Sequence, residues 1–351
     1  MTFAGREPDL SVLTSGQWQA IDAAVDRALE FLARNQQPDG TFAAPAGGQP
    51  GITSLAIMAF LSRGHVPGEG KYGPQLTKAI ESVLDVQQPD GLLAVNRRGS
   101  GSSGRATYNH AIAGLMLGEV YGMTSGDLEQ RVRAAIIKGL EFARSDQTRS
   151  KRNPRDRGGW RYLELVGAND ADLTATCWFL MFYRSAKNAG FDVPAEWVDD
   201  AMGYVRRCHT REDGTFVYAL AQDEERYASG ATVAGGVIAL AMSGEHDSAM
   251  AQAAGQWIVQ SSFAQYNRRR HPDDRYHYSA YYCSQAMFQL GGDYWEKFYP
   301  DLQRVLLANQ NADGSWESEA MHDSQFGNVY TTALTVLALT PPHQLLPIYQ
   351  R

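Results

Sequence analysis

The stretch LEFLARNQQPDGTF at residues 29–42 decides the fold, because it joins an amphipathic helix to a tight turn that ends in an aromatic residue. Leu29, Phe31 and Leu32 recur at the three- and four-residue spacing of a helix with one buried face. The Asp-Gly pair supplies the positive backbone angle that ends the helix, at Gly40. Phe42 is then expected to fold back over the helix end. The stretch therefore predicts an outer helix closed by a turn.

The same pattern occurs four more times along the chain. The matching stretches are ESVLDVQQPDGLL (81–93), GGWRY (158–162), YVRRCHTREDGTFVY (204–218) and LLANQNADGSW (306–316). Their turn glycines are Gly91, Gly159, Gly214 and Gly314. The spacing between turns is about 50 to 70 residues, with one gap about twice as long. A degenerate repeat near residues 251–265 would fill that gap, so the sequence predicts six repeats.

A second kind of helix follows each turn and is apolar nearly all round. These segments are residues 52–64, 110–122, 172–183, 231–244, 281–292 and 329–339. A helix that is apolar on every face must be buried, and the small residues in these segments let neighbouring helices pack closely. We therefore expect an all-α fold, an (α/α)6 barrel or toroid, in which six inner helices are wrapped by six outer ones. Every inner helix then begins at the same end of the ring, and polar residues there share one mouth.

The whole chain of 351 residues is expected to form this single toroid, with residues 1–18 as an N-terminal extension. The net charge of -7 argues against nucleic acid as a partner, because phosphate binding needs a basic face. Cys177, Cys208 and Cys283 are far apart and show no paired spacing, which favours a reducing compartment. The N-terminus lacks the pattern of a secretory signal, so a cytoplasmic location is expected, although a removed leader would leave no trace.

With the repeats laid out, the chain resembles the squalene-cyclase and prenyltransferase repeat superfamily, whose signature is a helix, a Gln, a short spacer and Gly-x-Trp or Gly-x-Phe. It is most similar to bacterial single-toroid prenyltransferase or squalene-oxidase repeat proteins, at AMFQLGGDYW (286–295) and VYTTALTVLAL (329–339). Trp316 is the clearest conventional repeat residue, whereas most repeats have Phe or Leu at that position. Squalene-hopene cyclases carry two helical domains, and this chain has room for one.

The segment from Asn169 to Ala175 resembles the Asp-x-Asp-Asp-Thr-Ala motif of proton-initiated terpene cyclases, with Leu173 in place of the last Asp. In that family the middle Asp protonates an alkene or epoxide. The resemblance implies this role for Asp172, with Asp170 beside it, both expected to face the cavity. The alternative is an N-cap, in which either Asp only binds the first N–H groups of the following helix.

Aromatic residues and two histidines are expected to line the mouth and bind substrate. They are His110, Trp160, Tyr162, Trp178, Tyr227, Tyr276, His277, Tyr278, Tyr281 and Tyr330. Aromatic faces suit polyisoprene chains and stabilise carbocations. The alternative is ordinary packing between helices for the aromatic residues, and hydrogen bonding for the histidines.

Two basic clusters, residues 149–157 and 268–271, are expected at the same end of the ring. They could hold a diphosphate or contact an anionic membrane surface, or be solvated insertions.

Three functions remain open from the sequence. The first is an isoprenoid-binding enzyme, an isomerase of the class II terpene cyclase type, and the second is a toroid that binds a lipid, peptide or protein partner without chemistry. The third is a polysaccharide-active barrel, which needs two carboxylates across the cavity and has only Asp170, Asp172, Glu119 and Asp323 to supply them. A small apolar ligand is the expected partner, and no cofactor is expected.

We predict that the protein binds no zinc. His110, His277 and Cys283 suggest a zinc site only through the resemblance to protein prenyltransferases. Those enzymes hold zinc with an Asp, a Cys and a His, but no Asp-x-Cys pair occurs in this chain and the histidines lack ligand spacing. Elemental analysis of the purified protein should find no stoichiometric metal, and one zinc per chain would overturn the prediction.

Overall fold

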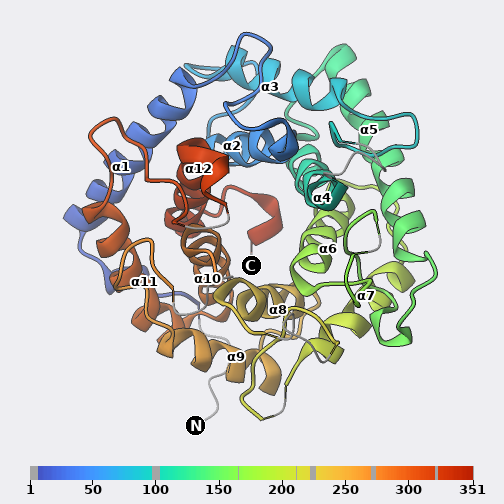
Figure 1. The fold of residues 1–351 in the computed structure, drawn as a ribbon. Coiled ribbons are helices and arrows are strands. Elements are labelled where there is room, and N and C mark those ends of the chain that lie inside the picture. Colours follow the sequence, from blue (N-terminus) through green and yellow to red (C-terminus); the bar gives the residue numbers. More distant parts are fainter. Residues whose placement is uncertain are drawn as a thin grey trace.

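The computed structural model describes residues 7–96, 103–164, 166–210, 212–221, 227–269, 274–320 and 323–350. These residues form a closed ring of inner helices inside a ring of outer helices, with no strand in the element order of the described chain (Figure 1). The inner helices are α2 (Gly51–Leu61), α4 (Ser103–Val120), α6 (Leu173–Asn188), α8 (Gly230–Met242), α10 (Tyr276–Leu290) and α12 (Gly327–Leu339). The outer helices are α1 (Ser15–Arg34), α3 (Gly73–Asp85), α5 (Gly126–Gln147), α7 (Ala195–Cys208), α9 (Ala249–Gln260) and α11 (Gly292–Ala308). The prediction of an all-α toroid is confirmed.

The inner helices are buried on all sides, as their composition predicts. Every residue of α2 is buried, and in α8 burial runs from Gly230 to Leu240. Close packing depends on small residues: a Cβ on Gly236 would lie 2.5 Å from the ring of Phe216, the aromatic residue of the preceding turn. The turn aromatics Phe42, Trp160, Phe216 and Trp316 are all fully buried. They therefore fill the layer between the two rings.

In four of the repeats one glutamine ties the turn to the next outer helix, an arrangement we call the glutamine clamp. The Nε2 of Gln36, after α1, donates to the carbonyl of Gly40 at 3.0 Å and to that of Gln75 in α3 at 2.9 Å. The equivalent pairs are Gln87 to Gly91 and Ala135, Gln147 to Gly158 and Trp197, and Gln310 to Gly314 and Ala24. Because Ala24 belongs to α1, the Gln310 clamp joins the last outer helix to the first and closes the ring.

The turn glycines have the backbone conformation that the sequence predicts. Gly40, Gly91, Gly214 and Gly314 have φ of 92°, 93°, 71° and 93°. In the third repeat the positive φ, 87°, belongs to Gly158 rather than to Gly159, which corrects the position expected there. Each turn also lies directly against the neighbouring outer helix, since a Cβ on Gly91 would be 2.2 Å from the carbonyl oxygen of Lys138 in α5.

The C-terminal segment closes the end of the ring where the inner helices finish. The chain enters the ring centre after α12 (Figure 1), through η5 (Pro341–His343) and η6 (Pro347–Tyr349). The backbone N–H of Ile348 donates to Glu119 Oε2 at 3.2 Å, and Gln289 Nε2 donates to the carbonyl of Tyr349 at 2.7 Å. The hydroxyl of Tyr349 is hydrogen-bonded to that of Tyr281. The ring is therefore covered at one end by its own chain.

At the N-terminus, α1 begins at Ser15, inside the stretch expected to be an extension. Trp18 stacks on Tyr299 of α11, with ring centroids 5.7 Å apart. Within the described part of the chain, none of the helices has the length and apolar character needed to cross a membrane.

We predict that Gly91→Ala and Gly314→Ala destabilise the protein more than Gly122→Ala and Gly190→Ala. All four glycines have positive φ, so each alanine carries the backbone strain of about 1 kcal/mol. Only the first two also place Cβ against a backbone oxygen, at 2.2 and 2.4 Å, whereas nothing lies within 4 Å of the second two. The clash should add roughly 1–3 kcal/mol in urea unfolding. Equal losses in all four variants would show that contact with the next outer helix is unimportant.

Candidate functional site

A cavity of about 880 Å³ opens at the end of the ring where the inner helices begin. All six inner helices contribute to its wall, mostly from their first two turns. Leu55, Ile112 and Trp178 lie one or two turns further into α2, α4 and α6, and we call them the cavity floor. Tyr108, Tyr162, Tyr218, Tyr227, Tyr278 and Tyr330 form much of the wall. The depth of the cavity is therefore apolar and aromatic.

Three arginines of the cavity wall, which we call the cavity rim, lie at the starts of inner helices or in the loops before them. Arg105 is in the first turn of α4, with its guanidinium 4.9 Å from the ring centroid of Phe326. Arg161, in the loop before α6, is 3% exposed and lies 4.9 Å from the Tyr162 ring. Arg275 is the N-cap residue of α10, and its Nε is 3.2 Å from Asp323 Oδ2.

The charge of the cavity is positive. Among the described residues, Asp323 is the one carboxylate in the cavity wall, against the three arginines. The inner-helix N-termini add partial positive charge at the same end. The mouth therefore attracts anions.

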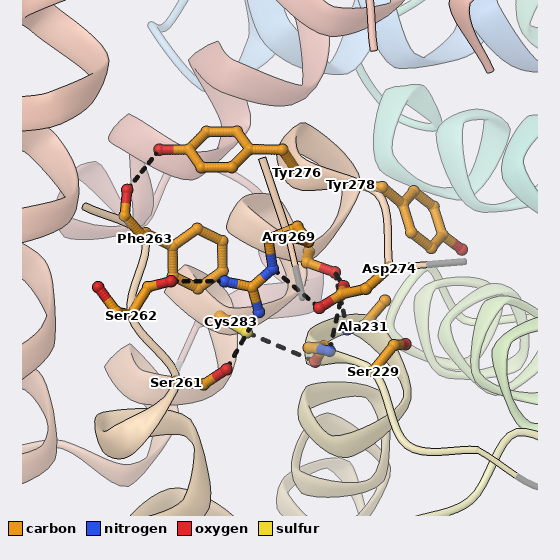
Figure 2. Close-up of polar contacts among 12 residues, drawn as sticks. Ser229, Ala231, Ser261, Ser262, Phe263, Arg269, Asp274, Tyr276, Tyr278 and Cys283 are labelled. Carbon is orange, nitrogen blue, oxygen red and sulfur yellow. Dashed lines mark hydrogen bonds and ion pairs between the residues drawn. The ribbon is translucent and has the colours of Figure 1, made fainter. Parts of the chain in front are cut away.

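A buried ion pair lies beside the starts of α8 and α10 (Figure 2). Arg269 Nε lies 2.8 Å from Asp274 Oδ2, and both side chains are less than a tenth exposed. The guanidinium also lies 4.0 Å from the Phe263 ring centroid. Asp274 Oδ1 accepts the N–H of Gly230, the first residue of α8, at 3.3 Å. Arg275 follows Asp274 directly, so the pair holds one rim arginine in register with the start of α8.

Asp172 caps α6 and does not itself line the cavity. Its Oδ1 accepts the N–H of Ala175 at 2.8 Å, the hydroxyl of Thr174 at 3.0 Å and the hydroxyl of Tyr108 at 3.0 Å. The side chain is wholly buried, whereas Tyr108 and Thr174 both belong to the cavity wall. Burial raises the pKa of Asp172, against the opposing effects of Arg161 and these hydrogen bonds. The expected exposure to the cavity is corrected: Asp172 lies one layer behind the wall.

Asp170 forms an ion pair away from the cavity. Its carboxylate accepts the backbone N–H of Arg152 at 2.6 Å and lies 2.6 Å from Arg152 Nη2. Burial acts to raise the pKa of Asp170, but the hydrogen bonds and charge of Arg152 outweigh it and hold the pKa below its ordinary value. Asp170 therefore anchors the loop that carries Arg161, rather than lying beside Asp172 in the cavity.

Five of the ten expected binding residues line the cavity: Tyr162, Trp178, Tyr227, Tyr278 and Tyr330. Trp178 Nε1 donates to the Tyr278 hydroxyl at 2.7 Å, which joins α6 to α10 across the wall. The loop residue Glu319 accepts the backbone N–H groups of Tyr276, His277 and Tyr278, and so fixes the first turn of α10.

Three expected aromatic residues are core residues instead. Trp160 stacks on Phe179 at 4.5 Å and donates to the carbonyl of Ala143. Tyr276 donates its hydroxyl to the carbonyl of Phe263, and Tyr281 packs on Trp178 from beneath the floor. Their hydroxyl or indole groups are satisfied away from the cavity, which is why they face other helices.

The two histidines are also core residues. His110 Nδ1 accepts the N–H of Leu93 at 3.0 Å, and its Nε2 is 3.1 Å from the carbonyl of Gly139. His277 Nδ1 is 3.0 Å from the hydroxyl of Thr335. Burial lowers the pKa of each histidine to about 3, so both are neutral at physiological pH. In the described ranges no cluster of three or more His, Cys, Asp or Glu is arranged to hold a metal ion.

The basic clusters are largely structural. Arg149 donates to the carbonyl of Leu163 at 2.9 Å, Arg152 pairs with Asp170, and Arg269 is the buried partner of Asp274. Arg270 and His271 of the second cluster lie outside the described residues. The solvated-insertion interpretation is therefore wrong for Arg269, whereas Arg152 is exposed to solvent although it is paired with Asp170.

Sequence reasoning missed Tyr108, Arg105 and Arg275, and it quoted Arg161 only as part of a turn. Arg105 and Tyr108 precede the segment 110–122, because the inner helix begins seven residues earlier than its apolar run. The signal that could have identified these residues is their position in the sequence, because polar residues within two turns of an inner-helix start face the mouth.

A family model described as the prenyltransferase alpha-alpha toroid domain matches residues 77–267 and 259–348. No curated protein sequence matches the chain. Among solved structures, the type II terpene cyclase MstE from Scytonema in complex with merosterolic acid A is similar. The two structures align with a TM-score of 0.60 and 15% sequence identity, and the alignment covers 96% of this chain and 100% of that chain.

Carbohydrate-active proteins share the same ring. A glycoside hydrolase family 76 mannosidase from Bacteroides thetaiotaomicron has a TM-score of 0.64 at 12% identity, covering 92% of this chain and 98% of that chain. An unsaturated glucuronyl hydrolase specific for heparin has a TM-score of 0.60 at 12% identity, covering 92% and 96%. At such identities these likenesses show the common fold alone.

We predict that Glu119 makes the protein less stable as the pH rises. Burial raises the pKa of Glu119 to about 7, and the hydrogen bonds from Ser185 and Ile348 only partly oppose this. The folded chain therefore holds this proton more tightly than the unfolded chain, whose ordinary value is 4.5. The stabilisation is complete below about pH 4.5 and is lost as the pH rises through about 7.

Glu119→Gln should remove this dependence. Relative to wild type, the variant should gain stability between pH 5 and pH 8, on the order of 1–3 kcal/mol in urea unfolding. Glu141→Gln, at an exposed position on α5, is the matched control and should show no such gain. A constant difference between Glu119→Gln and wild type at both pH values would contradict the prediction.

Proposed function

The chain belongs to the prenyltransferase alpha-alpha toroid domain family, and we propose that it binds an isoprenoid-like ligand with an anionic head group in the central cavity. The observation that carries this proposal is the division of the cavity into an apolar floor and a rim of three arginines. A ligand that matches both parts is an amphiphile, with its apolar chain on the floor and its acid at the mouth.

The lower part of the cavity suits an isoprenoid chain. Leu55, Ile112 and Trp178 offer apolar surface, and the tyrosines around them offer aromatic faces. A volume of about 880 Å³ is within the range, about 300–1,000 Å³, of pockets that enclose small organic ligands. Aromatic faces also stabilise positive charge on a hydrocarbon, which an alkene acquires when it is protonated.

The upper part suits a carboxylate or a phosphate. Guanidinium groups bind such anions through paired, charge-assisted hydrogen bonds. Arg275 is already oriented by Asp323, and Arg161 is held between the rings of Tyr162 and Tyr218. The structural neighbour MstE has been solved with geranylgeranyl dihydroxybenzoate, described as its substrate, which joins an isoprenoid chain to a benzoate. That pairing supports the proposed ligand class.

Catalysis by Asp172 is the finer part of the proposal. A proton-initiated cyclisation, an isomerase reaction, needs a carboxyl that keeps its proton near an apolar cavity. Burial raises the pKa of Asp172, and its carboxyl is hydrogen-bonded to the Tyr108 and Thr174 hydroxyls, whose residues belong to the cavity wall. A non-catalytic toroid that stores or carries the same amphiphile is the alternative, and absence of any turnover would favour it.

The polysaccharide function has less support. A glycosidase needs two carboxyl groups flanking the scissile bond. Among the described residues the cavity wall supplies Asp323, which is paired with Arg275, whereas Glu119 lies at the covered end of the ring and Asp170 is paired with Arg152. The peripheral membrane contact and cytoplasmic location expected from the sequence stay predictions.

We predict that an anionic isoprenoid binds more tightly than its neutral counterpart. Titration calorimetry with geranylgeranoic acid, geranylgeranyl diphosphate and geranylgeraniol measures the contribution of the head group. Arg275→Met and Arg105→Met should each weaken binding of the acids by about 10-fold or more, because each removes a charge-assisted contact. Binding of the alcohol should change by less than about 3-fold.

The matched control is Arg131→Met, which removes an arginine that pairs with Asp85 on the outer surface and should leave all three affinities unchanged. Equal affinity for acid and alcohol would remove the anionic head group from the proposal. Failure of all three ligands to bind would contradict the isoprenoid class itself.

A further inference from the structure

A layer of hydroxyl groups separates the buried carboxyl of Asp172 from the cavity. The Tyr108 hydroxyl lies 3.0 Å from Asp172 Oδ1 and 2.8 Å from the Thr174 hydroxyl, and Thr174 in turn lies 3.0 Å from the same Oδ1. Tyr108 and Thr174 face the cavity, whereas Asp172 is wholly buried. A ligand in the cavity therefore meets these hydroxyls before it meets the carboxyl.

We propose that Tyr108 is the catalytic proton donor of this site, and that Asp172 supplies the proton through it. This inference rests on the proposed function, because it requires an alkene in the cavity. The Tyr108 hydroxyl donates to Asp172 Oδ1 in the structure; for transfer, a protonated Asp172 donates from Oδ1 to the Tyr108 oxygen and the Tyr108 O–H turns to the alkene. As that O–H bond breaks and a C–H bond forms on the alkene, the proton on Oδ1 moves to the Tyr108 oxygen. Tyr108 ends as it began, Asp172 becomes a carboxylate, and the ligand becomes a carbocation.

The cycle closes without another reagent. The cation cyclises along the chain, and the final cation gives up a proton to water at the mouth. Asp172 then regains a proton from solvent through Tyr108. The product is an isomer of the substrate that carries one hydrogen from water.

The contacts of Asp172 suit a group that gives up a proton and takes it back. Once ionised, Oδ1 accepts three hydrogen bonds, from Ala175, Thr174 and Tyr108, at the first turn of α6, and the charge of Arg161 acts in the same direction. Oδ2 is buried and has no hydrogen-bond partner among the described residues, which disfavours the ionised form at rest. Burial therefore acts to keep the proton on the carboxyl at rest, and the three hydrogen bonds stabilise the carboxylate after transfer.

Tyr108 suits the relay better than Thr174. A phenol gives up its proton more readily than an aliphatic hydroxyl, and in a concerted relay Asp172 replaces the proton as it leaves, which opposes the effect of burial and of Asp172 in raising the pKa of Tyr108 well above its ordinary value. Tyr108 also comes from α4, across the wall from Asp172, so its side chain spans from the carboxyl to the cavity. Trp178 is one turn beyond Thr174 on α6, so a cation formed beside Tyr108 has an aromatic neighbour.

The test compares Tyr108→Phe, Asp172→Asn and wild type with geranylgeranyl dihydroxybenzoate and geranylgeranyl diphosphate in D₂O. Mass spectrometry detects cyclic product, and wild type should give an isomer that carries one deuterium. Tyr108→Phe should lower kcat by about 100-fold or more, the usual effect of losing a proton-transfer group. Calorimetric affinity should change by less than about 3-fold, and the melting temperature should stay close to that of wild type. Asp172→Asn, which retains an oxygen to cap α6, should lose turnover similarly.

The matched control is Tyr299→Phe, which removes a buried tyrosine hydroxyl bonded to the carbonyl of Leu339, away from the cavity. Its kcat should equal that of wild type. The proposal is wrong if Tyr108→Phe keeps more than about a tenth of wild-type kcat. It is also wrong if Thr174→Val, rather than Tyr108→Phe, abolishes turnover.

Binding separates this inference from the proposed function. Wild type that binds both probes without forming cyclic product overturns the role of Tyr108 and leaves the binding function standing. Wild type that binds neither probe contradicts the ligand class, and the role of Tyr108 falls with it.

Discussion

The glutamine clamp is the interaction on which the rest of the structure depends. Each clamp joins a turn carbonyl to a carbonyl of the next outer helix, so the position of one repeat fixes the position of its neighbour. The Gln310 clamp applies the same bond to the first helix, where α12 also packs against α2 and α1, and the chain closes into a ring. Because the clamps lie at the turns, all the turns and all the inner-helix starts gather at one end. The mouth of the cavity is a direct result.

That geometry concentrates positive charge where the cavity opens. Six helix starts and three arginines share the mouth, and the carboxylates nearby are committed to other groups: Asp274 to Arg269, Asp170 to Arg152 and Glu319 to the first turn of α10. Each buried acid thereby fixes a piece of backbone that presents a cavity residue. Asp172 differs because a neutral hydroxyl, rather than a cation, stands directly on its carboxyl.

The fold could be predicted from local sequence signals. Predicting the site also required knowing which face of each inner helix points into the cavity. Gly40, Gly91, Gly214 and Gly314 were predictable because a turn of this kind needs positive φ whatever surrounds it. Tyr276, His277 and Tyr278 are consecutive, and only Tyr278 faces the cavity, since successive residues of a helix point in directions about 100° apart. Composition alone cannot tell which of the three residues lines the cavity, because that depends on the rotation of the helix about its axis.

Trp160 is a different case. It occupies the same place after its turn as Phe42 and Trp316, all of them fully buried between the rings, so the repeat pattern itself pointed to the core. Tyr108 was missed because its partner Asp172 is 64 positions away in the sequence, and no local pattern relates the two.

The C-terminal segment covers the end of the ring opposite the mouth. In the described part of the chain Ile348 and Tyr349 lie across the far end, so a ligand of the proposed class would enter and leave through the mouth. An elongated amphiphile must then enter with its hydrocarbon leading and leave with its acid leading. A flexible substrate that is converted into a rigid, bulkier product in the cavity would leave through the same opening more slowly than it entered. The shape of the product would then set its residence time.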